Sequence, residues 1–332
     1  MALAFDKIIV ITRRTAAEEL TERFGTRAQA RFYLEQEAAR SAAGAGPDFA
    51  AVERADQVYA RARDLLRAAL PQNAGAGGKQ AAARVQWVDR AFLPTFTFGE
   101  RDLVVTLGPD GLVVNAAKYV PDGLPLLAFN PDPERIEGVL VPFAVGEASA
   151  WLGRVLRGEY NCRKITMARA DLSDGQTLHA VNDLFVGRAT HVSARYRLQA
   201  GDKAEDQSSS GIIVSTGAGS TGWLRSVVAG AAGVVAARGG EPGPAALPDA
   251  ARFAWDAPFL RFSVREPWAS KTTGASLVHG EIARGQVLEI VSQMPQNGVV
   301  FSDGVEEDFL PFNSGAVARI RVADKSVSLI AA

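Results

Sequence analysis

The sequence predicts an α/β domain followed by a domain made mainly of β-strands. Up to about residue 145, short runs rich in Val, Ile and Leu alternate with stretches whose apolar residues recur at helical spacing. Beyond that point apolar and polar residues alternate one by one, as in strands with one buried face. The first pattern predicts a parallel sheet covered on both faces, and the second predicts antiparallel sheets. We expect the domains to span residues 1–145 and 146–332.

Four apolar runs predict the strands of the parallel sheet: 7–12, 84–89, 102–107 and 124–130. A helical insertion is predicted between the first two strands, at about residues 27–70. Thr26 and Gln29 fit a capping box at its start. Its second helix has apolar residues at helical spacing, namely Phe49, Val52, Tyr59, Ala62 and Leu66. Helices are also predicted at 111–119 and 147–160, and a flexible loop at 73–80.

The later part of the chain predicts several half-buried strands. In residues 190–199 the side chains expected on one face are Val192, Ala194, Tyr196 and Leu198. Residues 259–266 alternate in the same way. Residues 316–330 predict two strands joined at Asp324 and Lys325, whereas the polar segments 201–210 and 236–249 predict loops.

The composition excludes several classes of protein. The net charge is -1, which provides no general attraction to nucleic acid. A single cysteine, Cys162, excludes an internal disulfide and a cysteine-rich metal site. The apolar run 8–11 is too short for the core of a signal peptide, and no run reaches the roughly 18 residues of a membrane span. We therefore expect a cytoplasmic protein without nucleic-acid or membrane partners.

The segment Gly108-Pro109-Asp110-Gly111 joins a predicted strand to a predicted helix. A glycine-containing turn in that place presents backbone N–H groups to a phosphate. Asp110 would lie beside the phosphate, where a carboxylate can bridge a metal ion or accept a proton from an attacking hydroxyl. An ordinary turn with Asp110 as the helix N-cap fits the same residues. Pro109 cannot donate a hydrogen bond but fixes φ near the value of a first-turn helical residue, so we expect a stiffened phosphate turn.

A second glycine-rich turn spans residues 215–222. It contains three glycines and four hydroxyl side chains, and a helix is predicted from it to about Ala237. The arrangement favours an anion site at a helix N-terminus, and a plain glycine-rich connection is the alternative. The Gly-Lys-Ser/Thr ending of a Walker loop is absent.

A third feature is the pair Asn182 and Asp183, which interrupts the otherwise apolar run 180–188. Buried polar side chains need hydrogen-bond partners, and a bound ligand can supply them. The alternative for an Asn-Asp pair is a simple turn.

In this order the three motifs resemble those of the NAD kinase family, within the wider superfamily of diacylglycerol, sphingosine and NAD kinases. Residues 108–112 stand where the family has Gly-Gly-Asp-Gly-Thr, and Asn182-Asp183 stands where it has Asn-Glu or Asn-Asp. Residues 215–223 stand where it has Ser-Thr-Pro-Thr-Gly-Ser-Thr-Ala-Tyr. Residues 124–130 are similar to the family's strand that ends in Gly-Ile-Asn, and residues 301–304 are similar to its late Asp-Gly. Residues 262–267 resemble the mitochondrial branch of the family.

The resemblance implies an enzyme with an α/β domain and a β-rich, sandwich-like domain. The implied reaction transfers a phosphoryl group from ATP, or from polyphosphate, to the adenosine 2′-hydroxyl of NAD, with Mg²⁺ or another divalent cation. Asp110 would be the catalytic carboxylate, and Asn182 and Asp183 would hold the adenosine and ribose. The other nucleotide-binding residues implied are Gly108, Gly111, Asn130, Ser215, Thr216, Gly219, Ser220, Thr221 and Trp223. A homo-oligomer, either a dimer or a tetramer, is also expected.

The chain departs from the family pattern at several positions. Pro109 and Leu112 stand in place of a glycine and a threonine, and Gly217 and Ala218 stand in place of a proline and a threonine. These changes keep the candidate base but remove hydrogen-bond donors. Two alternatives therefore remain: a kinase of another hydroxyl acceptor, such as a sugar or lipid, and a nucleotide-binding sensor that has the same fold but little turnover.

Overall fold

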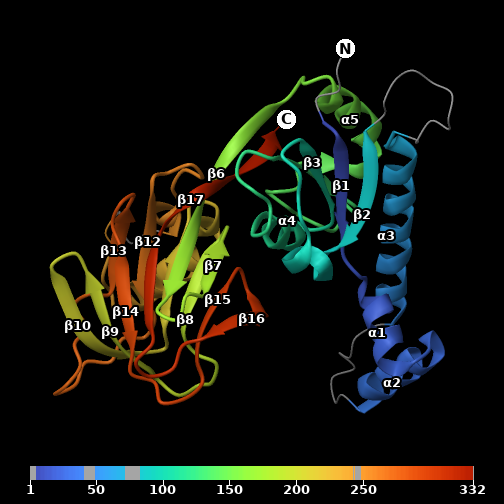
Figure 1. Cartoon of the computed structure of the whole chain (residues 1–332). Coiled ribbons are helices and arrows are strands. Elements are labelled where there is room, and N and C mark those ends of the chain that lie inside the picture. The colour runs from blue at the N-terminus through green and yellow to red at the C-terminus, as the bar shows by residue number, and fades with distance from the viewer. Residues whose placement is uncertain (1–4, 41–48, 72–82, 242, 244–247, 332) are drawn as a thin grey trace. The chain divides into compact units, whose positions relative to one another are not determined.

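The computed structural model describes residues 5–40, 49–71, 83–241, 243 and 248–331 (Figure 1). The chain divides into two compact units. The first comprises Met1–Val120, Leu124–Cys162 and Leu329–Ala332, and the second comprises Pro121–Gly123 and Arg163–Ser328. The predicted loop at 73–80 lies outside the described residues.

A parallel sheet forms the centre of the first unit. Its strands are β1 (Lys7–Thr12), β2 (Arg84–Asp89), β3 (Asp102–Leu107), β4 (Pro125–Asn130) and β5 (Phe143–Ala144). They lie in the order β2-β1-β3-β4-β5, and each neighbouring pair is parallel. Every residue of β3 and β4 is buried, as the continuous apolar runs predict for central strands of a parallel sheet. The predicted α/β fold of this part of the chain is therefore confirmed.

Helices and 3₁₀ turns accompany the sheet of the first unit: α1 (Ala16–Phe24), α2 (Arg27–Arg40), α3 (Phe49–Ala69), η1 (Arg90–Thr95), α4 (Asp110–Ala117), η2 (Val145–Glu147) and α5 (Ala148–Leu156). Figure 1 shows the long helix α3 running beside β2. The buried side chains of Tyr59, Ala62 and Leu66 on α3 join those of Ile8 and Val10 on β1 in one apolar core. The helical insertion is thus part of the core of this unit.

Two capping boxes differ in how completely they form. At α1, which the sequence patterns above did not predict, Thr15 accepts from the Glu18 N–H and Glu18 accepts from the Thr15 N–H. At α2 the predicted box is only half made. The hydroxyl of Thr26 accepts from the Gln29 N–H at 3.2 Å, but the Gln29 side chain contacts the Thr26 hydroxyl and not its backbone N–H.

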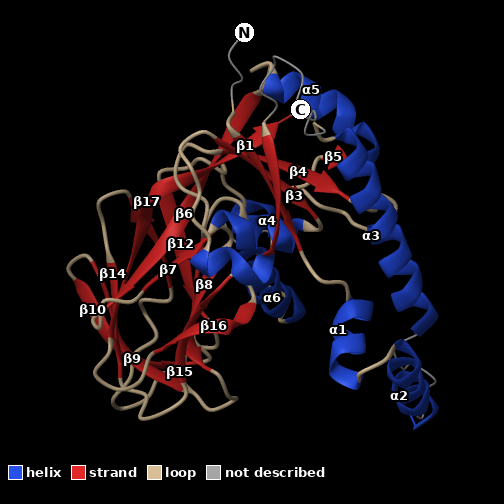
Figure 2. Cartoon of the chain, turned by 45° about the vertical axis from the view of Figure 1, so that its right-hand side comes forward, coloured by secondary structure: helices blue, strands red, loops and turns tan. Residues whose placement is uncertain are grey.

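The second unit is a sandwich of two sheets (Figure 2). One has the order β10-β9-β14-β17, with β6 pairing β17 and β7, and the other has the order β13-β12-β11-β8-β15-β16. The elements are β6 (Asn161–Leu172), β7 (Thr177–Ala180), β8 (Asp183–Arg188), β9 (Ala194–Ala200), β10 (Lys203–Ser209), β11 (Ile212–Ser215), η3 (Gly219–Thr221), α6 (Trp223–Ala237), η5 (Pro248–Ala251), β12 (Phe259–Val264), β13 (His279–Ala283), β14 (Leu288–Ser292), β15 (Gly298–Ser302), β16 (Val305–Pro311) and β17 (Val317–Ala331).

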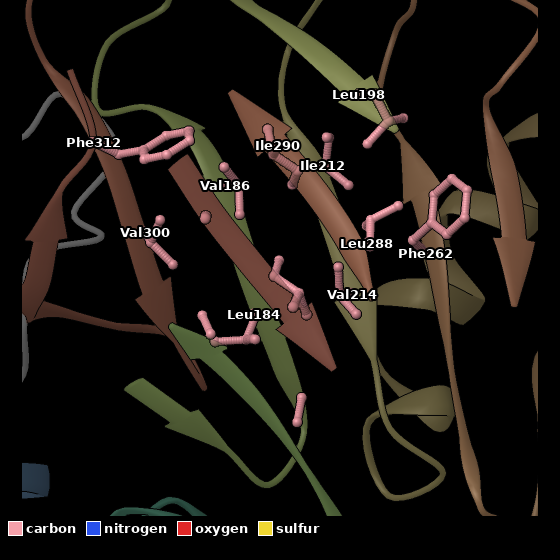
Figure 3. Close-up of a cluster of buried hydrophobic side chains, with 14 of the residues drawn as sticks. Leu184, Val186, Leu198, Ile212, Val214, Phe262, Leu288, Ile290, Val300 and Phe312 are labelled. Atoms are coloured by element: carbon pink, nitrogen blue, oxygen red, sulfur yellow. The ribbon is translucent and has the colours of Figure 1, made fainter. Parts of the chain in front are cut away.

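The core of the sandwich follows from the two-residue alternation of its strands. Leu184 and Val186 of β8 point inward and meet side chains of the facing sheet, including Leu288 and Ile290 of β14 (Figure 3). The intervening residue Phe185 points to the outer face, where it packs with side chains of α6. The expected β-rich sandwich is therefore confirmed.

Three expectations for this region are wrong. Residues 203–209 form strand β10 and not a loop, because β10 pairs with β9 and its polar side chains find partners inside the unit. The hydroxyl of the buried Tyr196 on β9 contacts Ser209 at 2.7 Å and Gln207 at 3.1 Å. Residues 317–331 form one continuous strand, β17, because backbone pairing with the neighbouring strands β14 and β6 holds it extended. The third wrong expectation is that Val192 lies on the buried face of a strand: it lies before β9, and its side chain is 59% exposed.

None of the helices in the described part of the chain combines the length and the hydropathy that a transmembrane span requires.

Replacing Tyr196 by Phe should test how strongly the polar strand β10 is held. The change leaves the buried Ser209 and Gln207 without the phenolic hydroxyl. A buried polar group that loses its partner costs roughly 1–3 kcal/mol, so Tyr196→Phe should lower the free energy of unfolding by about that amount in urea denaturation. Tyr33→Phe is the control, since Tyr33 is 50% exposed. An equal effect of the two changes would contradict the role given to the Tyr196 hydroxyl.

Candidate functional site

The turn between β3 and α4 lies at the carboxyl ends of the parallel strands. The Gly108 N–H donates to the Phe129 carbonyl of β4 at 3.1 Å, which ties the end of β3 to its neighbour. Pro109, with φ of -74° and ψ of 173°, is the N-cap of α4, and Asp110 is the first helical residue. The alternative in which Asp110 caps the helix is therefore wrong, and Pro109 stands one residue before the helical position expected for it.

The position of Leu112 explains its apolar side chain. Leu112 is buried, and a Cβ atom on Gly108 would lie 2.7 Å from its Cδ2 atom. A side chain at 108 would therefore displace the buried Leu112, while Gly111 has open space around it. Leu112 supports the turn from inside, where a threonine hydroxyl would need a hydrogen-bond partner.

The carboxylate of Asp110 binds the backbone of a distant segment. Its two oxygens accept from the N–H groups of Val139 and Leu140, each at 3.0 Å. Burial raises the pKa of Asp110, and these backbone hydrogen bonds act in the opposite direction. A Cβ atom on Gly138 would lie 2.5 Å from the Asp110 Oδ1 atom, so a glycine is needed where this segment passes the carboxylate. Gly138 carries no motif signal of its own, and the sequence patterns missed it.

Asn130, the last residue of β4, holds the other end of the same segment. Its side-chain amide donates to the Ile136 carbonyl at 2.8 Å, and its Oδ1 accepts from the Asp132 N–H at 2.9 Å. Asn130 is buried. Asp110 and Asn130, predicted from separate motifs, are thus brought together through one loop, residues 131–141.

In the second unit, the Asn182-Asp183 pair and the turn 215–222 pack directly against each other. The Thr216 N–H donates to the Asn182 carbonyl at 2.9 Å, and the Thr216 hydroxyl donates to the Val181 carbonyl. A Cβ atom on Gly219 would lie 2.3 Å from the Asn182 oxygen and 2.8 Å from Asp183 Oδ1. Only glycine fits at this contact, which joins two motifs that lie far apart in the sequence.

Asp303 fixes the backbone of the Asn182-Asp183 pair. It lies in a turn with φ of 57°, directly before Gly304. Its carboxylate accepts from three successive N–H groups, those of Val181 at 3.1 Å, Asn182 at 2.7 Å and Asp183 at 3.2 Å. The sequence indicated Asp303 only as part of the family's late Asp-Gly and not as a residue of the site. An aspartate at a glycine turn after an apolar strand was the available signal.

Asp183 itself is a buried carboxyl group with an unused oxygen. Its Oδ1 atom has no hydrogen-bond partner among the described residues. Burial raises the pKa of Asp183 to about 7, a hydrogen bond with Ser215 acts against this rise, and the negative charge of Asp303 adds to it. Near neutral pH this group can both accept and donate a hydrogen bond, which suits it to a ligand hydroxyl.

The hydroxyl groups of the turn mostly bond to the chain itself. Ser220 donates to the Gly217 carbonyl at 2.7 Å and accepts from the Phe253 N–H at 3.3 Å. The Ser215 hydroxyl lies 3.2 Å from the Thr216 carbonyl oxygen and can donate its single proton either there or to the Asp183 carboxyl group. Thr221 is exposed and donates to the Ala218 carbonyl at 3.4 Å. The turn is therefore a rigid, internally bonded segment, and its predicted contacts with a nucleotide stay a prediction.

Trp223 opens α6 and belongs to an aromatic cluster. Its ring stacks on Phe185 with the ring centres 5.6 Å apart, and Phe301 lies at 6.4 Å on the same side of the sheet. The guanidinium of Arg265 lies 5.4 Å from the ring centre of Trp223. Because Trp223 is only partly buried, this cluster presents an aromatic surface beside the turn.

The predicted residues fall into two groups. Gly108, Asp110, Gly111 and Asn130 belong to the first unit, and Asn182, Asp183, Ser215, Thr216, Gly219, Ser220, Thr221 and Trp223 belong to the second. Within each unit the structure brings together residues from separate motifs.

Comparison with known proteins finds relatives among the NAD kinases. An NAD kinase of Thermococcus sibiricus is 28% identical over 130 residues, which cover 38% of this chain and 45% of that protein. An NAD kinase of Symbiobacterium thermophilum is 32% identical over 161 residues, which cover 43% and 52%. A probable NADH kinase of Oryza sativa subsp. japonica is 24% identical over 226 residues, which cover 61% and 63%. The chain thus spans less than two thirds of the length of these relatives, and no family model matches it.

Solved structures of NAD kinases share the fold. A yeast NADH kinase complexed with NADH matches with a TM-score of 0.57 at 16% identity, covering 99% of this chain and 84% of that chain. An NAD kinase from Archaeoglobus fulgidus in complex with ATP matches with a TM-score of 0.54 at 12% identity, covering 98% and 93%. The resemblance to the NAD kinase family is therefore confirmed in sequence and in fold.

Replacing Asp303 by Asn should loosen the backbone at 181–183. An amide offers one acceptor oxygen in place of two, and its NH₂ group faces N–H donors. We expect Asp303→Asn to lower the free energy of unfolding by roughly 1–3 kcal/mol in urea denaturation. Asp174→Asn is a matched control, because Asp174 also precedes a glycine in a turn but is exposed. A similar, small effect of both changes would show that the three hydrogen bonds contribute little.

Asp183 should make the stability of the chain depend on pH. Its pKa in the folded chain is about 7, whereas an unfolded aspartate titrates at about 4. Between these values the folded chain keeps a proton that the unfolded chain has lost, so the free energy of unfolding falls as the pH rises. Asp183→Asn removes this slope.

We therefore compare the free energy of unfolding of Asp183→Asn with that of the original chain. The difference between the two proteins should change in favour of the variant by about 2 kcal/mol when the pH is raised from about 5 to about 8. Urea denaturation of both proteins at the two pH values measures this difference. If the difference between the two proteins is the same at both pH values, Asp183 does not titrate in this range.

Proposed function

We propose that this chain, which shares both sequence and fold with the NAD kinases, is itself a kinase that phosphorylates NAD or NADH. The observation that carries the proposal is the buried carboxyl group of Asp183. It is held by Asp303 through the backbone and lies against Gly219, and it keeps one oxygen without a partner. A structural role alone does not require an unpartnered buried oxygen, whereas a ligand hydroxyl would satisfy it.

The second unit would hold the acceptor nucleotide. In this proposal Asp183 bonds a ribose hydroxyl, Asn182 bonds the adenosine, and the aromatic surface of Trp223 lies beside the base. Ser215, Thr216, Gly219, Ser220 and Thr221 would shape the pocket, mostly through their backbone. The rigid bonding inside the turn supports this assignment, since a preorganised site loses little entropy when a ligand binds.

Asp110 would act on the hydroxyl that is phosphorylated. Its carboxylate would accept the proton of the adenosine 2′-hydroxyl while that oxygen forms a bond to the γ-phosphorus of ATP, and the bond between the γ-phosphorus and the leaving oxygen of ADP breaks. The raised pKa of Asp110 makes it a better proton acceptor than an exposed aspartate. Gly108, Gly111 and Asn130 would form the surrounding turn in the first unit.

A divalent cation fits this arrangement only as a partner of the phosphates. The described residues hold no group of three or more His, Cys, Asp or Glu side chains that could hold a metal ion. Mg²⁺ commonly uses one or two carboxylates together with substrate phosphates. The Asp110 oxygens accept backbone N–H groups, those of Val139 and Leu140 among them, and a carboxylate has about four acceptor positions, so Asp110 can contribute one ligand. The cation would neutralise charge on the phosphates.

A nucleotide-binding sensor remains the second candidate. Two observations favour it: Pro109 has no N–H to offer a phosphate, and the buried Leu112 replaces a hydroxyl. A kinase of another hydroxyl acceptor would still use Asp110 as its catalytic carboxylate, but it would not need Asp183 to bind a ribose hydroxyl. The cytoplasmic location and the homo-oligomeric state stay predictions.

The test is an assay of the purified chain with ATP, Mg²⁺ and either NAD or NADH, in which formation of NADP or NADPH is measured. Asp110→Asn should lower turnover on the order of 10²-fold or more, while calorimetry should show NAD binding close to that of the original chain. Glu134→Gln is the control, because Glu134 is an exposed carboxylate in the loop that Asp110 holds.

Two outcomes would contradict the proposed activity, and a third would contradict the role given to Asp110. Binding of NAD without turnover would select the sensor. Turnover with a different hydroxyl compound, but not with NAD or NADH, would select the other kinase. Unchanged kinetics in Asp110→Asn would remove Asp110 from the mechanism.

A further inference from the structure

The pairing between β1 and β3 ends before the strands themselves end. Their register stops at Ile11 beside Thr106, although β1 continues to Thr12 and β3 continues to Leu107. On their other sides, β1 stays paired with β2 as far as Thr12, and β3 stays paired with β4 as far as Leu107. The interruption therefore concerns only the contact between β1 and β3, and it lies directly before the turn that carries Asp110.

The next hydrogen bond of this ladder can be named from the geometry of a parallel pair. The Gly108 N–H points to β4, where it donates to the Phe129 carbonyl at 3.1 Å. Because successive residues of a strand direct their backbone groups to opposite neighbours, the Leu107 carbonyl is directed to β1. One further step of the register would bring the Arg13 N–H to this carbonyl.

The hydroxyl of Tyr59 takes the place of that hydrogen bond. It accepts from the Arg13 N–H at 3.3 Å and donates to the Leu107 carbonyl at 3.0 Å. A direct bond between an N–H and a carbonyl has a length of about 2.9 Å. With a hydroxyl oxygen between the two groups, the ends of β1 and β3 are held further apart than a continuous ladder would hold them.

Helix α3 fixes the position of this hydroxyl. Tyr59 is buried, and Ala62 and Leu66, which follow it on the same face of α3, join it in the apolar core of the first unit. Burial also raises the pKa of the Tyr59 hydroxyl, so that it keeps the proton that it donates. The separation of the two strand ends is therefore set by a helix that is itself anchored in the core.

The end of β3 determines where the turn with Asp110 begins. Gly108 is bonded to β4 on one side, and Leu107 is bonded to Tyr59 on the other. Helix α4 follows at once, since the Leu112 N–H donates to the Pro109 carbonyl at 2.9 Å. With so short a connection, a displacement of the strand end towards β1 is passed on to the carboxylate of Asp110.

We propose that Tyr59 is a positioning residue for the turn that carries Asp110. Its hydroxyl keeps the ends of β1 and β3 apart and thereby holds the carboxylate where the acceptor hydroxyl must meet it. The inference rests on the kinase function proposed above. Tyr59 acts through the Leu107 carbonyl and not on the reacting atoms. In Tyr59→Phe the Arg13 N–H and this carbonyl lose their common partner, and a direct bond between them would draw β3 towards β1.

The experiment compares the kinetics of full-length variants with ATP, Mg²⁺ and NAD. Tyr59→Phe should lower kcat about tenfold with little change in the KM for NAD, because a small displacement of a catalytic group affects the transition state more than substrate binding. Tyr160→Phe is the matched control, since it removes the same atom from a tyrosine that packs against the same core. Leu66→Val is the second control: it weakens the packing of α3 but keeps the hydroxyl, so its kcat should not change.

Backbone hydrogen exchange gives a second measurement that does not depend on turnover. The amides of residues 108–112 should exchange faster in Tyr59→Phe than in Tyr160→Phe, because the turn has lost one of its two anchors. Faster exchange in a chain that does not phosphorylate NAD or NADH would contradict the proposed function but support the positioning of the turn by Tyr59.

Three results would overturn the role of Tyr59. One is equal kcat and equal exchange of residues 108–112 in Tyr59→Phe and Tyr160→Phe. Another is a fall of kcat in Leu66→Val as large as that in Tyr59→Phe, since lost packing alone would then explain both. The third is a loss of kcat/KM in Tyr59→Phe that comes entirely from a higher KM for NAD, which would make Tyr59 a determinant of binding.

Discussion

The candidate nucleotide site of the second unit depends on the carboxylate of Asp303. Three successive N–H groups, at residues 181–183, point to its two oxygens. Backbone donors that leave a β-ladder inside a protein must find another acceptor, and here a single side chain supplies it. With the backbone fixed in this way, Asn182 and Asp183 keep their side chains for other contacts. The absence of a side chain at Gly219 leaves room for the Asp183 oxygen, because a Cβ atom there would lie 2.8 Å from Oδ1.

The first unit uses the same principle with a different pair of residues. Asp110 accepts from the N–H groups of Val139 and Leu140, and Asn130 bonds the earlier part of the same loop. The candidate catalytic carboxylate is therefore also a structural one. A change at Asp110 can affect the loop as well as the chemistry, so turnover and nucleotide binding must be separated when its role is judged.

The departures from the family pattern have structural reasons that their sequence alone does not reveal. Leu112 is buried against Gly108, which leaves no room for any side chain at 108 and makes an apolar residue suitable at 112. Pro109 lies at the N-cap, where its extended ψ of 173° precedes the helix and where α4 requires no N–H from it. Both residues are therefore compatible with a stable turn.

By itself the sequence determined the α/β and β-sandwich regions, most strand positions and the motifs of the candidate site. These follow from local patterns, because the two-residue and 3.6-residue periods are set by the geometry of strands and helices. Asp110, Asn182 and Asp183 were found because polar residues interrupt apolar runs or follow strands. The tertiary structure alone decided the strand β10, the unbroken β17, and the roles of Gly138 and Asp303. It also placed the hydroxyl of Tyr59 between the ends of β1 and β3. Each of these depends on partners far along the chain, such as Tyr196 for Ser209 and Asp303 for the N–H of Asn182. A polar segment becomes a strand, or an aspartate a backbone acceptor, only when folding supplies such partners, and no local pattern records them.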